Sequence, residues 1–111
     1  MTVIAVKRSK ETAFSEIVTK GHSGYSEADS DIVCAAVSSA CELTADIFEQ
    51  FGVDYSLDCD GDIPRVCFCI SQNGANKAKK QSIERIVGGF VKFCEDLAEA
   101  YPDYVTITTE V

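Results

Sequence analysis

The sequence contains no apolar run of more than a few residues in its 111 positions. Because a helix needs about 20 mostly apolar residues to cross a bilayer, we expect no membrane span. The first residues, Met1 to Lys7, also lack a basic start followed by a long apolar stretch. We therefore expect no signal peptide and take the cytoplasm as the default location. The ordinary share of hydrophobic residues, 46%, predicts one globular domain over residues 1–111.

Positive charge is scarce, with 10 Lys and Arg against 18 Asp and Glu and a net charge of −8. A protein that coats nucleic acid needs clustered positive charge, so we exclude that class and direct nucleic-acid binding. Between Glu27 and Asp62 there are ten acids and no Lys or Arg, so this stretch carries −10 and the rest of the chain +2. The acidic stretch either attracts a basic protein or only solvates one face of the fold.

No Cys-x-x-Cys pair occurs among the six cysteines, and there is only one histidine. Six cysteines in a short secreted chain would suggest three disulfides. Since this chain has no secretion signal and enough apolar residues for a core, we expect reduced thiols instead. Cys67 and Cys69 have the spacing of two positions on one face of a strand, which does not fit a structural zinc site. We predict no metal and no other cofactor.

Repeats, low-complexity tracts and linkers are absent as well. The hydrophobic periodicity predicts strands at 2–8, 13–21, 53–57, 63–70 and 104–111, and helices at 31–50 and 76–100. We expect hairpins between the first two strands and, through a turn at 58–62, between the next two. This β-β-α-β-β-α-β order predicts an α+β fold, with a mostly antiparallel sheet and two helices. Gly88-Gly89 lies within the second helix, and we attribute it to a close packing contact.

One pair of residues has the types needed for nucleophilic catalysis. His22 lies in the polar segment 21–30, which we expect to be an exposed loop, and Cys34 lies in the first turn of the helix that follows. The partial positive charge of a helix N-terminus favours the thiolate form of a cysteine. A nearby imidazole can take the thiol proton, and free N–H groups at the helix start can stabilise an oxyanion. Asp29, Ser30 or Asp31 can cap this helix.

The competing interpretation is that these residues are structural, because buried cysteines usually pack as small hydrophobic side chains. Cys41 lies two turns into the helix, where the field of the terminus has faded. The remaining cysteines have neither a helix terminus nor a histidine close in sequence; they are Cys59, Cys67, Cys69 and Cys94. We therefore expect one candidate nucleophile and five packing cysteines.

The residues around the pair form a specific motif. Gly21-His22-Ser23 is followed by Asp31-Ile32-Val33-Cys34-Ala35-Ala36-Val37-Ser38. This motif resembles the signature of the Prp family, the YsxB-like ribosomal-processing cysteine proteases. The segment 101–105, Tyr-Pro-Asp-Tyr-Val, is similar to that family's last helix-to-strand junction. The resemblance implies a protease that removes an N-terminal extension, next to aromatic residues, from large-subunit ribosomal protein 27, and that forms homodimers.

The resemblance also implies roles for individual residues. Cys34 is then the nucleophile and His22 the general base of a Cys–His dyad, with Asp31 and Ser38 as supporting residues. The residues of the implied substrate loop are Gly21, Ser23, Gly24 and Tyr25. Two positions depart from the family pattern. Ser23 stands where the family usually has Ala, and no glycine precedes Asp31. The second departure affects how the loop moves over substrate, but neither removes the dyad.

Two other classes of function remain open at this stage. One is a non-catalytic ribosome-assembly or binding module with the same fold, which predicts an unreactive Cys34 and no cleavage. The other is a thiol-based redox or metal sensor, which predicts bound metal or a reversible disulfide. The presence of both dyad residues favours the protease over the first class, and the cysteine spacing disfavours the second.

Overall fold

The computed structural model describes residues 1–7, 16–21, 31–60, 65–71 and 74–110. In chain order the elements are β1 (Thr2–Lys7), β2 (Glu16–Lys20), α1 (Ile32–Gln50), β3 (Tyr55–Asp60), β4 (Arg65–Ile70), α2 (Lys77–Ala100) and β5 (Val105–Glu110). The predicted β-β-α-β-β-α-β order and the α+β class are therefore confirmed. No helix within the described ranges is long and apolar enough to cross a membrane.

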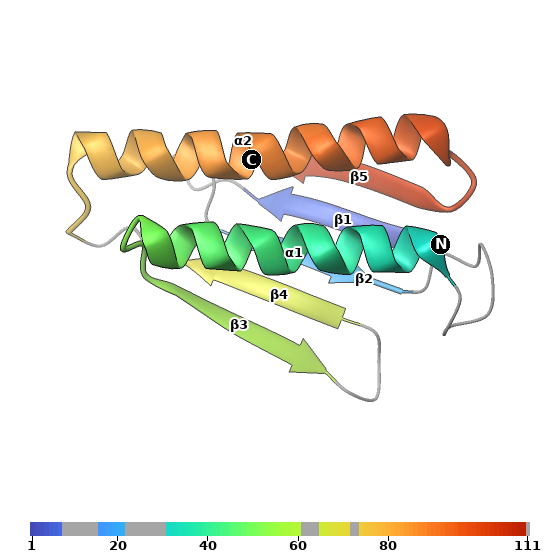
Figure 1. Cartoon of the computed structure of the whole chain (residues 1–111), viewed down its shortest axis with the longest axis horizontal. Helices are drawn as coiled ribbons and strands as arrows, with labels where there is room; N and C mark the ends of the chain where they lie inside the picture. Colours follow the sequence, from blue (N-terminus) through green and yellow to red (C-terminus); the bar gives the residue numbers. More distant parts are fainter. Residues whose placement is uncertain (8–15, 22–30, 61–64, 72–73, 111) are drawn as a thin grey trace.

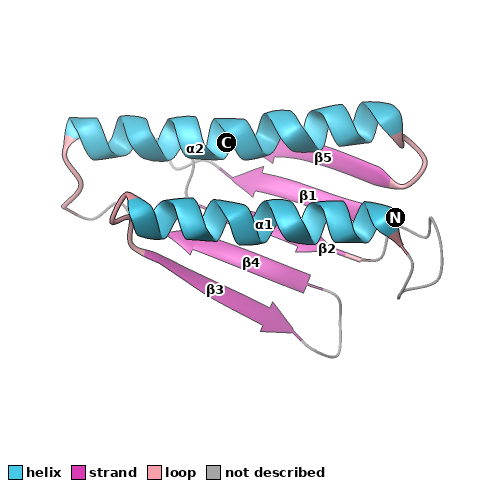
Figure 2. Cartoon of the chain, in the orientation of Figure 1, coloured by secondary structure: helices cyan, strands magenta, loops and turns pink. Residues whose placement is uncertain are grey.

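The five strands form one sheet in the order β3-β4-β2-β1-β5. Three neighbouring pairs are antiparallel, and β1 pairs with β5 in parallel. The sheet is thus mostly antiparallel, as predicted, and the expected β1–β2 and β3–β4 hairpin pairings are present. Both helices lie on the same face of the sheet and run antiparallel to each other (Figures 1 and 2).

The core lies between the helices and the sheet because the apolar positions of each element face inward. Alternate residues of β1, Ile4 and Val6, are fully buried, and so are Phe48 of α1 and Phe68 of β4. The rings of Phe48 and Phe68 meet edge to face with centroids 6.4 Å apart. Burying a large apolar side chain contributes roughly 1.5–3 kcal/mol, so this packing fixes how α1 lies on the sheet.

The third strand differs from its prediction, which placed it at 53–57 with a turn at 58–62. In the structure β3 begins at Tyr55 and continues to Asp60, because Asp58, Cys59 and Asp60 pair with residues of β4. Backbone hydrogen bonds across the hairpin outweigh the weak strand preference of the two aspartates. Residues 13–15 of the second predicted strand and 63–64 of the fourth lie outside the described residues.

The prediction that Gly88-Gly89 marks a close packing contact is wrong for the residues that the structure describes. A Cβ atom built on either glycine of α2 meets nothing within 4 Å, apart from the immediate chain neighbours and the backbone of the helix itself. Among the residues that the structure describes, no close contact therefore requires glycine at these positions. Gly89 instead lines an apolar groove on the outer side of the helix pair.

Candidate active site

The first turn of α1 is built around Asp31. This residue has an extended backbone, with φ −80° and ψ 98°, and stands immediately before the helix. Its Oδ1 atom accepts hydrogen bonds from the backbone N–H groups of Val33 and Cys34, both at 3.0 Å. Although it is an acid, Asp31 is 5% exposed. Of the three residues that the sequence offered as a cap, Asp31 is the one that caps the helix.

Cys34 occupies the third position of α1 and its side chain is half-buried. It lies within the turn where the partial charge of the helix N-terminus acts, as the sequence predicted. Ser38 follows one turn later, on the same helix face, and is exposed. The described part of the structure thus presents a half-buried Cys34 at the N-terminal end of α1.

The amides of this turn are less available than the sequence suggested. The sequence predicts free N–H groups at the helix start, but two of them, those of Val33 and Cys34, donate to Asp31. The Ala35 N–H donates to the Asp31 backbone carbonyl at 3.1 Å. Ile32 therefore supplies the first-turn amide that none of these three bonds uses.

Three of the other cysteines fit the packing role that we expected. Cys41, Cys67 and Cys94 are 6%, 4% and 0% exposed. Burial raises the pKa of Cys94 to about 12, and burial together with a hydrogen bond to Glu16 raises the pKa of Cys67 to about 12. Both stay protonated and unreactive near neutral pH.

Cys69 does not fit that role. It is exposed, with its Sγ atom 3.7 Å from that of Cys67, so the prediction of burial is wrong for this residue. Cys69 is directed to the sheet face without helices because strand residues alternate between faces, and Phe68 next to it takes the inward position. Within the described ranges no group of three or more His, Cys, Asp and Glu could hold a metal ion.

His22 lies outside the described residues, as do the predicted loop residues Ser23, Gly24 and Tyr25. The structure does describe Gly21, which follows β2 at the end of the molecule where α1 begins (Figure 1). Gly21 has φ +85°, and a Cβ atom there would be 2.6 Å from the Met1 carbonyl oxygen. This position therefore needs glycine, because an L-residue would be strained and would collide with backbone.

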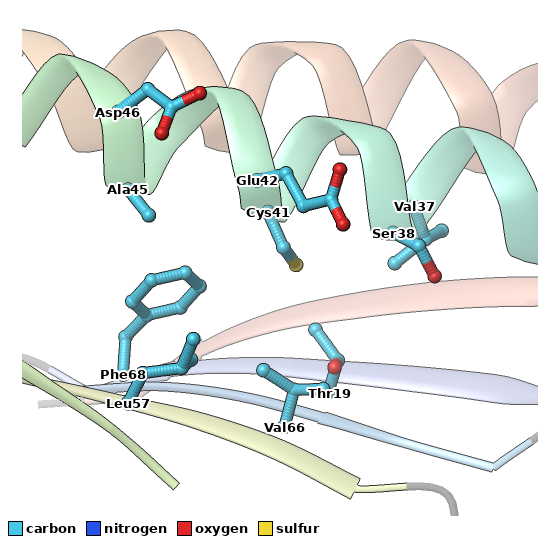
Figure 3. A pocket seen from close by; sticks show the side chains of 10 residues that line it. All are labelled: Thr19, Val37, Ser38, Cys41, Glu42, Ala45, Asp46, Leu57, Val66 and Phe68. Atoms are coloured by element: carbon cyan, nitrogen blue, oxygen red, sulfur yellow. The ribbon is translucent and has the colours of Figure 1, made fainter. Parts of the chain in front are cut away.

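A cleft of about 430 Å³ opens beside α1, on the side toward β3 and β4 (Figure 3). Ser38 lines the end nearest to Cys34, and Glu42 and Asp46 line it further along the helix. Leu57 of β3 and Phe68 of β4 belong to the opposite side, which the sheet forms. The cleft therefore extends along the helix face that carries Cys34.

The architecture and the cysteine at the start of α1 can be compared with known proteins. The model of the cysteine protease Prp family matches residues 1–106. The chain belongs to the Prp family. Family membership confirms the resemblance and supports protease activity in general. No curated protein sequence matches the chain.

Solved structures share the fold. The S. aureus ribosomal processing protease Prp with a covalently linked product peptide has a TM-score of 0.84 at 14% identity, over 99% of this chain and 100% of that one. The same S. aureus protease with a substrate peptide gives a TM-score of 0.80 at 13% identity, with the same coverage. SMU.848 from Streptococcus mutans gives a TM-score of 0.79 at 24% identity, over 99% of this chain and 94% of that one.

Compared with the Prp motif in the sequence, the structure places Cys34, Asp31 and Ser38 on one helix end and leaves His22 outside the described residues. The cleft and the positions of Glu42 and Asp46 in it were not predicted from the sequence. A signal was available, because Glu42 follows Cys34 by eight residues and thus lies on nearly the same helix face.

Asp31→Ala tests the role of the cap in this Prp domain. We expect the free energy of unfolding to fall by about 1–2 kcal/mol, because the N–H groups of Val33 and Cys34 lose their acceptor. Asp31→Asn is the matched variant, since Asn caps helices as well as Asp does and should retain most of the stability. Urea unfolding followed by circular dichroism measures both. Equal losses for the two variants would show that the carboxylate charge, rather than the cap, stabilises this helix start.

Proposed function

We propose that this chain is a cytoplasmic cysteine endopeptidase that removes the N-terminal extension of large-subunit ribosomal protein 27 during ribosome assembly. The main support for this proposal is the position of Cys34, which is half-buried in the first turn of α1 in a chain that matches the Prp family over residues 1–106. Two further observations support the proposal. The cleft that begins at Ser38, one helical turn from Cys34, offers space for a substrate chain, and the related S. aureus protein was solved with peptides.

The proposed mechanism uses a Cys–His dyad. His22 takes the proton of the Cys34 thiol, and the sulfur attacks the carbonyl carbon of the scissile peptide bond. The C–N bond then breaks, His22 gives its proton to the leaving amine, and an acyl-thioester remains on Cys34. A water molecule, deprotonated by His22, attacks the thioester, which releases the acid product and restores the thiol.

The two supporting residues act through position. Asp31 fixes the first turn, and therefore the place of Cys34, through its two hydrogen bonds at 3.0 Å. Because it occupies the amides of Val33 and Cys34, we assign the oxyanion to the amide of Ile32 together with donors supplied by the loop that contains Gly21, Ser23, Gly24 and Tyr25. Ser38, exposed one turn from Cys34, contacts the substrate at the entrance to the cleft.

The deciding experiment incubates the purified protein with ribosomal protein 27 that carries its extension and follows the products by mass spectrometry. We expect cleavage at a single bond and a transient mass increase on Cys34 from the acyl-thioester. Binding without cleavage by the folded protein would favour the non-catalytic assembly module. If the folded protein neither binds nor cleaves ribosomal protein 27, that protein is not its substrate.

We also propose a homodimer, which the resemblance to the family implies. Supporting it is a groove of about 550 Å³ on the outer side of α1 and α2, lined mainly by apolar and small residues. Leu43 of α1 and Phe93 of α2 line this groove and are 61% and 44% exposed. Exposed apolar side chains gathered in one groove are typical of an association surface.

Light scattering should therefore give twice the chain mass of 12.0 kDa. Leu43→Lys is expected to shift the protein to the monomer, because it would bury an unpaired charge in the interface. Val3→Lys is the control, since Val3 is exposed on the sheet face away from the helices. A dimer that tolerates Leu43→Lys would place the interface elsewhere, and a monomeric parent protein would exclude the homodimer.

A further inference from the structure

The cleft beside α1 combines two kinds of surface. On the sheet side, Leu57 and the half-buried Val66 provide apolar contact, and Leu57 is 48% exposed. On the helix side, Glu42 and Asp46 carry carboxylates one turn apart (Figure 3). A cleft with an apolar wall along its length and acids at its edge suits a side chain that is aliphatic along its stem and positively charged at its tip.

The two carboxylates are available for a ligand. Within the described residues, neither Glu42 nor Asp46 forms a hydrogen bond or an ion pair with another side chain. The next acid along the helix differs, because Glu49 accepts a hydrogen bond of 2.9 Å from the Tyr55 hydroxyl. That bond, desolvation and the negative charges of Glu49 and Asp46 raise the pKa of Tyr55, which keeps the hydroxyl as the donor. Glu42 and Asp46 thus form the open acidic edge of the cleft.

Their distance from Cys34 follows from helix geometry. Glu42 and Asp46 are eight and twelve residues beyond Cys34, which corresponds to about 12 Å and 18 Å along the axis at 1.5 Å per residue. An extended peptide advances about 3.3 Å per residue. A substrate chain that runs from Cys34 along the cleft therefore brings a side chain about four to five residues from the scissile bond to the two acids.

We propose that this cleft is a specificity subsite for one lysine or arginine of the substrate, located about four to five residues from the scissile bond. The aliphatic stem of that residue packs against Leu57 and Val66, and its charged group pairs with Glu42 and Asp46. The inference rests on the proposed protease function and adds to it a substrate feature that is read by short-range contacts. General attraction by the acidic stretch would instead be independent of position.

A lysine scan tests the proposal. The parent peptide spans the cleavage site of the extension, with each of its own basic residues replaced by norleucine. One lysine is then placed in turn at each of the six positions on either side of the scissile bond. We expect kcat/KM to rise about 3- to 10-fold, mainly through KM, at one or two adjacent positions, since each exposed ion pair contributes modestly. Diaminopropionate at the same position, with the charge but no stem, should recover little of the gain.

Two double variants make the test specific. In the Glu42→Gln/Asp46→Asn variant, kcat/KM for the lysine peptide divided by kcat/KM for the norleucine peptide should fall to about 1. Glu84→Gln/Glu99→Gln on α2 removes the same net charge from exposed positions outside the cleft and should keep the ratio. Equal gains at every position, or the same loss of ratio in both double variants, would overturn the subsite while leaving the protease function intact. Failure to cleave any peptide would overturn the protease function, and the subsite with it.

Discussion

Replacing Cys34 with alanine is expected to abolish cleavage of the ribosomal protein extension, lowering kcat by at least about 10³-fold. The reason is chemical, because the acyl-thioester cannot form without the sulfur atom. Alanine is well tolerated in a helix and Cys34 is only half-buried, so the variant should fold normally. His22→Ala should lower kcat by about 10²–10⁴-fold, the range that a general base contributes.

The control for this experiment is Cys69→Ser. Cys69 is an exposed cysteine of β4 on the sheet face opposite to α1, so its replacement should leave kcat and KM unchanged. Rates are measured by mass spectrometry of the products, with circular dichroism as a check of folding. Full activity of a folded Cys34→Ala variant would disprove the dyad assignment. If Cys34→Ala raises KM and leaves kcat unchanged, Cys34 acts in substrate binding rather than in the chemical step.

The largest loss of stability is expected from Phe48→Ala. Phe48 is 0% exposed, and its ring lies 5.6 Å from that of Tyr55 and 6.4 Å from that of Phe68, measured between centroids. Truncating such a side chain removes the buried surface and leaves a cavity, which costs about 3–5 kcal/mol. A domain of this size is stable by about 5–15 kcal/mol, so the variant should be folded only marginally.

Phe51→Ala is the matched control for this prediction. The same atoms are removed three residues further along the chain, where the side chain is 55% exposed. We expect a change within about 0.5 kcal/mol. Urea unfolding measures both variants, and the slope of the transition should stay constant if only stability changes. A similar, small loss for both variants would mean that the core does not depend on the aromatic contacts of Phe48.

The elements of the fold were largely predictable from the sequence because they depend on local patterns. Helical spacing marked 31–50 and 76–100, and the structure places α1 and α2 within one residue of those ranges. The end of β3 was not predictable in this way, since Asp58 and Asp60 are poor strand formers whose pairing with β4 is a tertiary effect. Gly88-Gly89 shows the same limit, because a dipeptide does not reveal what lies opposite it.

The candidate site also has parts that could be predicted from the sequence and parts that could not. Cys34 at a helix start and Asp31 as its cap follow from residues next to each other in the sequence. The cleft does not, because its sheet side brings together Thr19, Leu57 and Phe68 from three strands. Their adjacency depends on the order β3-β4-β2, which alternating hydrophobicity does not encode. Charge counting identified an acidic stretch, but only the structure separates Glu42 and Asp46, at the cleft, from Glu49, bonded to Tyr55.

The parallel pairing of β1 with β5 has a consequence for how the chain is made. Thr2 pairs with Val105, so one edge of β1 stays without its partner until more than 100 further residues have been synthesised. The β1–β2 hairpin can form early, because its strands are separated only by a short segment. Until β5 arrives, the β1 backbone offers unpaired hydrogen-bonding groups to any other strand in reach. Pairing of β1 with β5 is therefore a late step of biosynthesis, and the nascent chain is exposed to aggregation at this edge until that step.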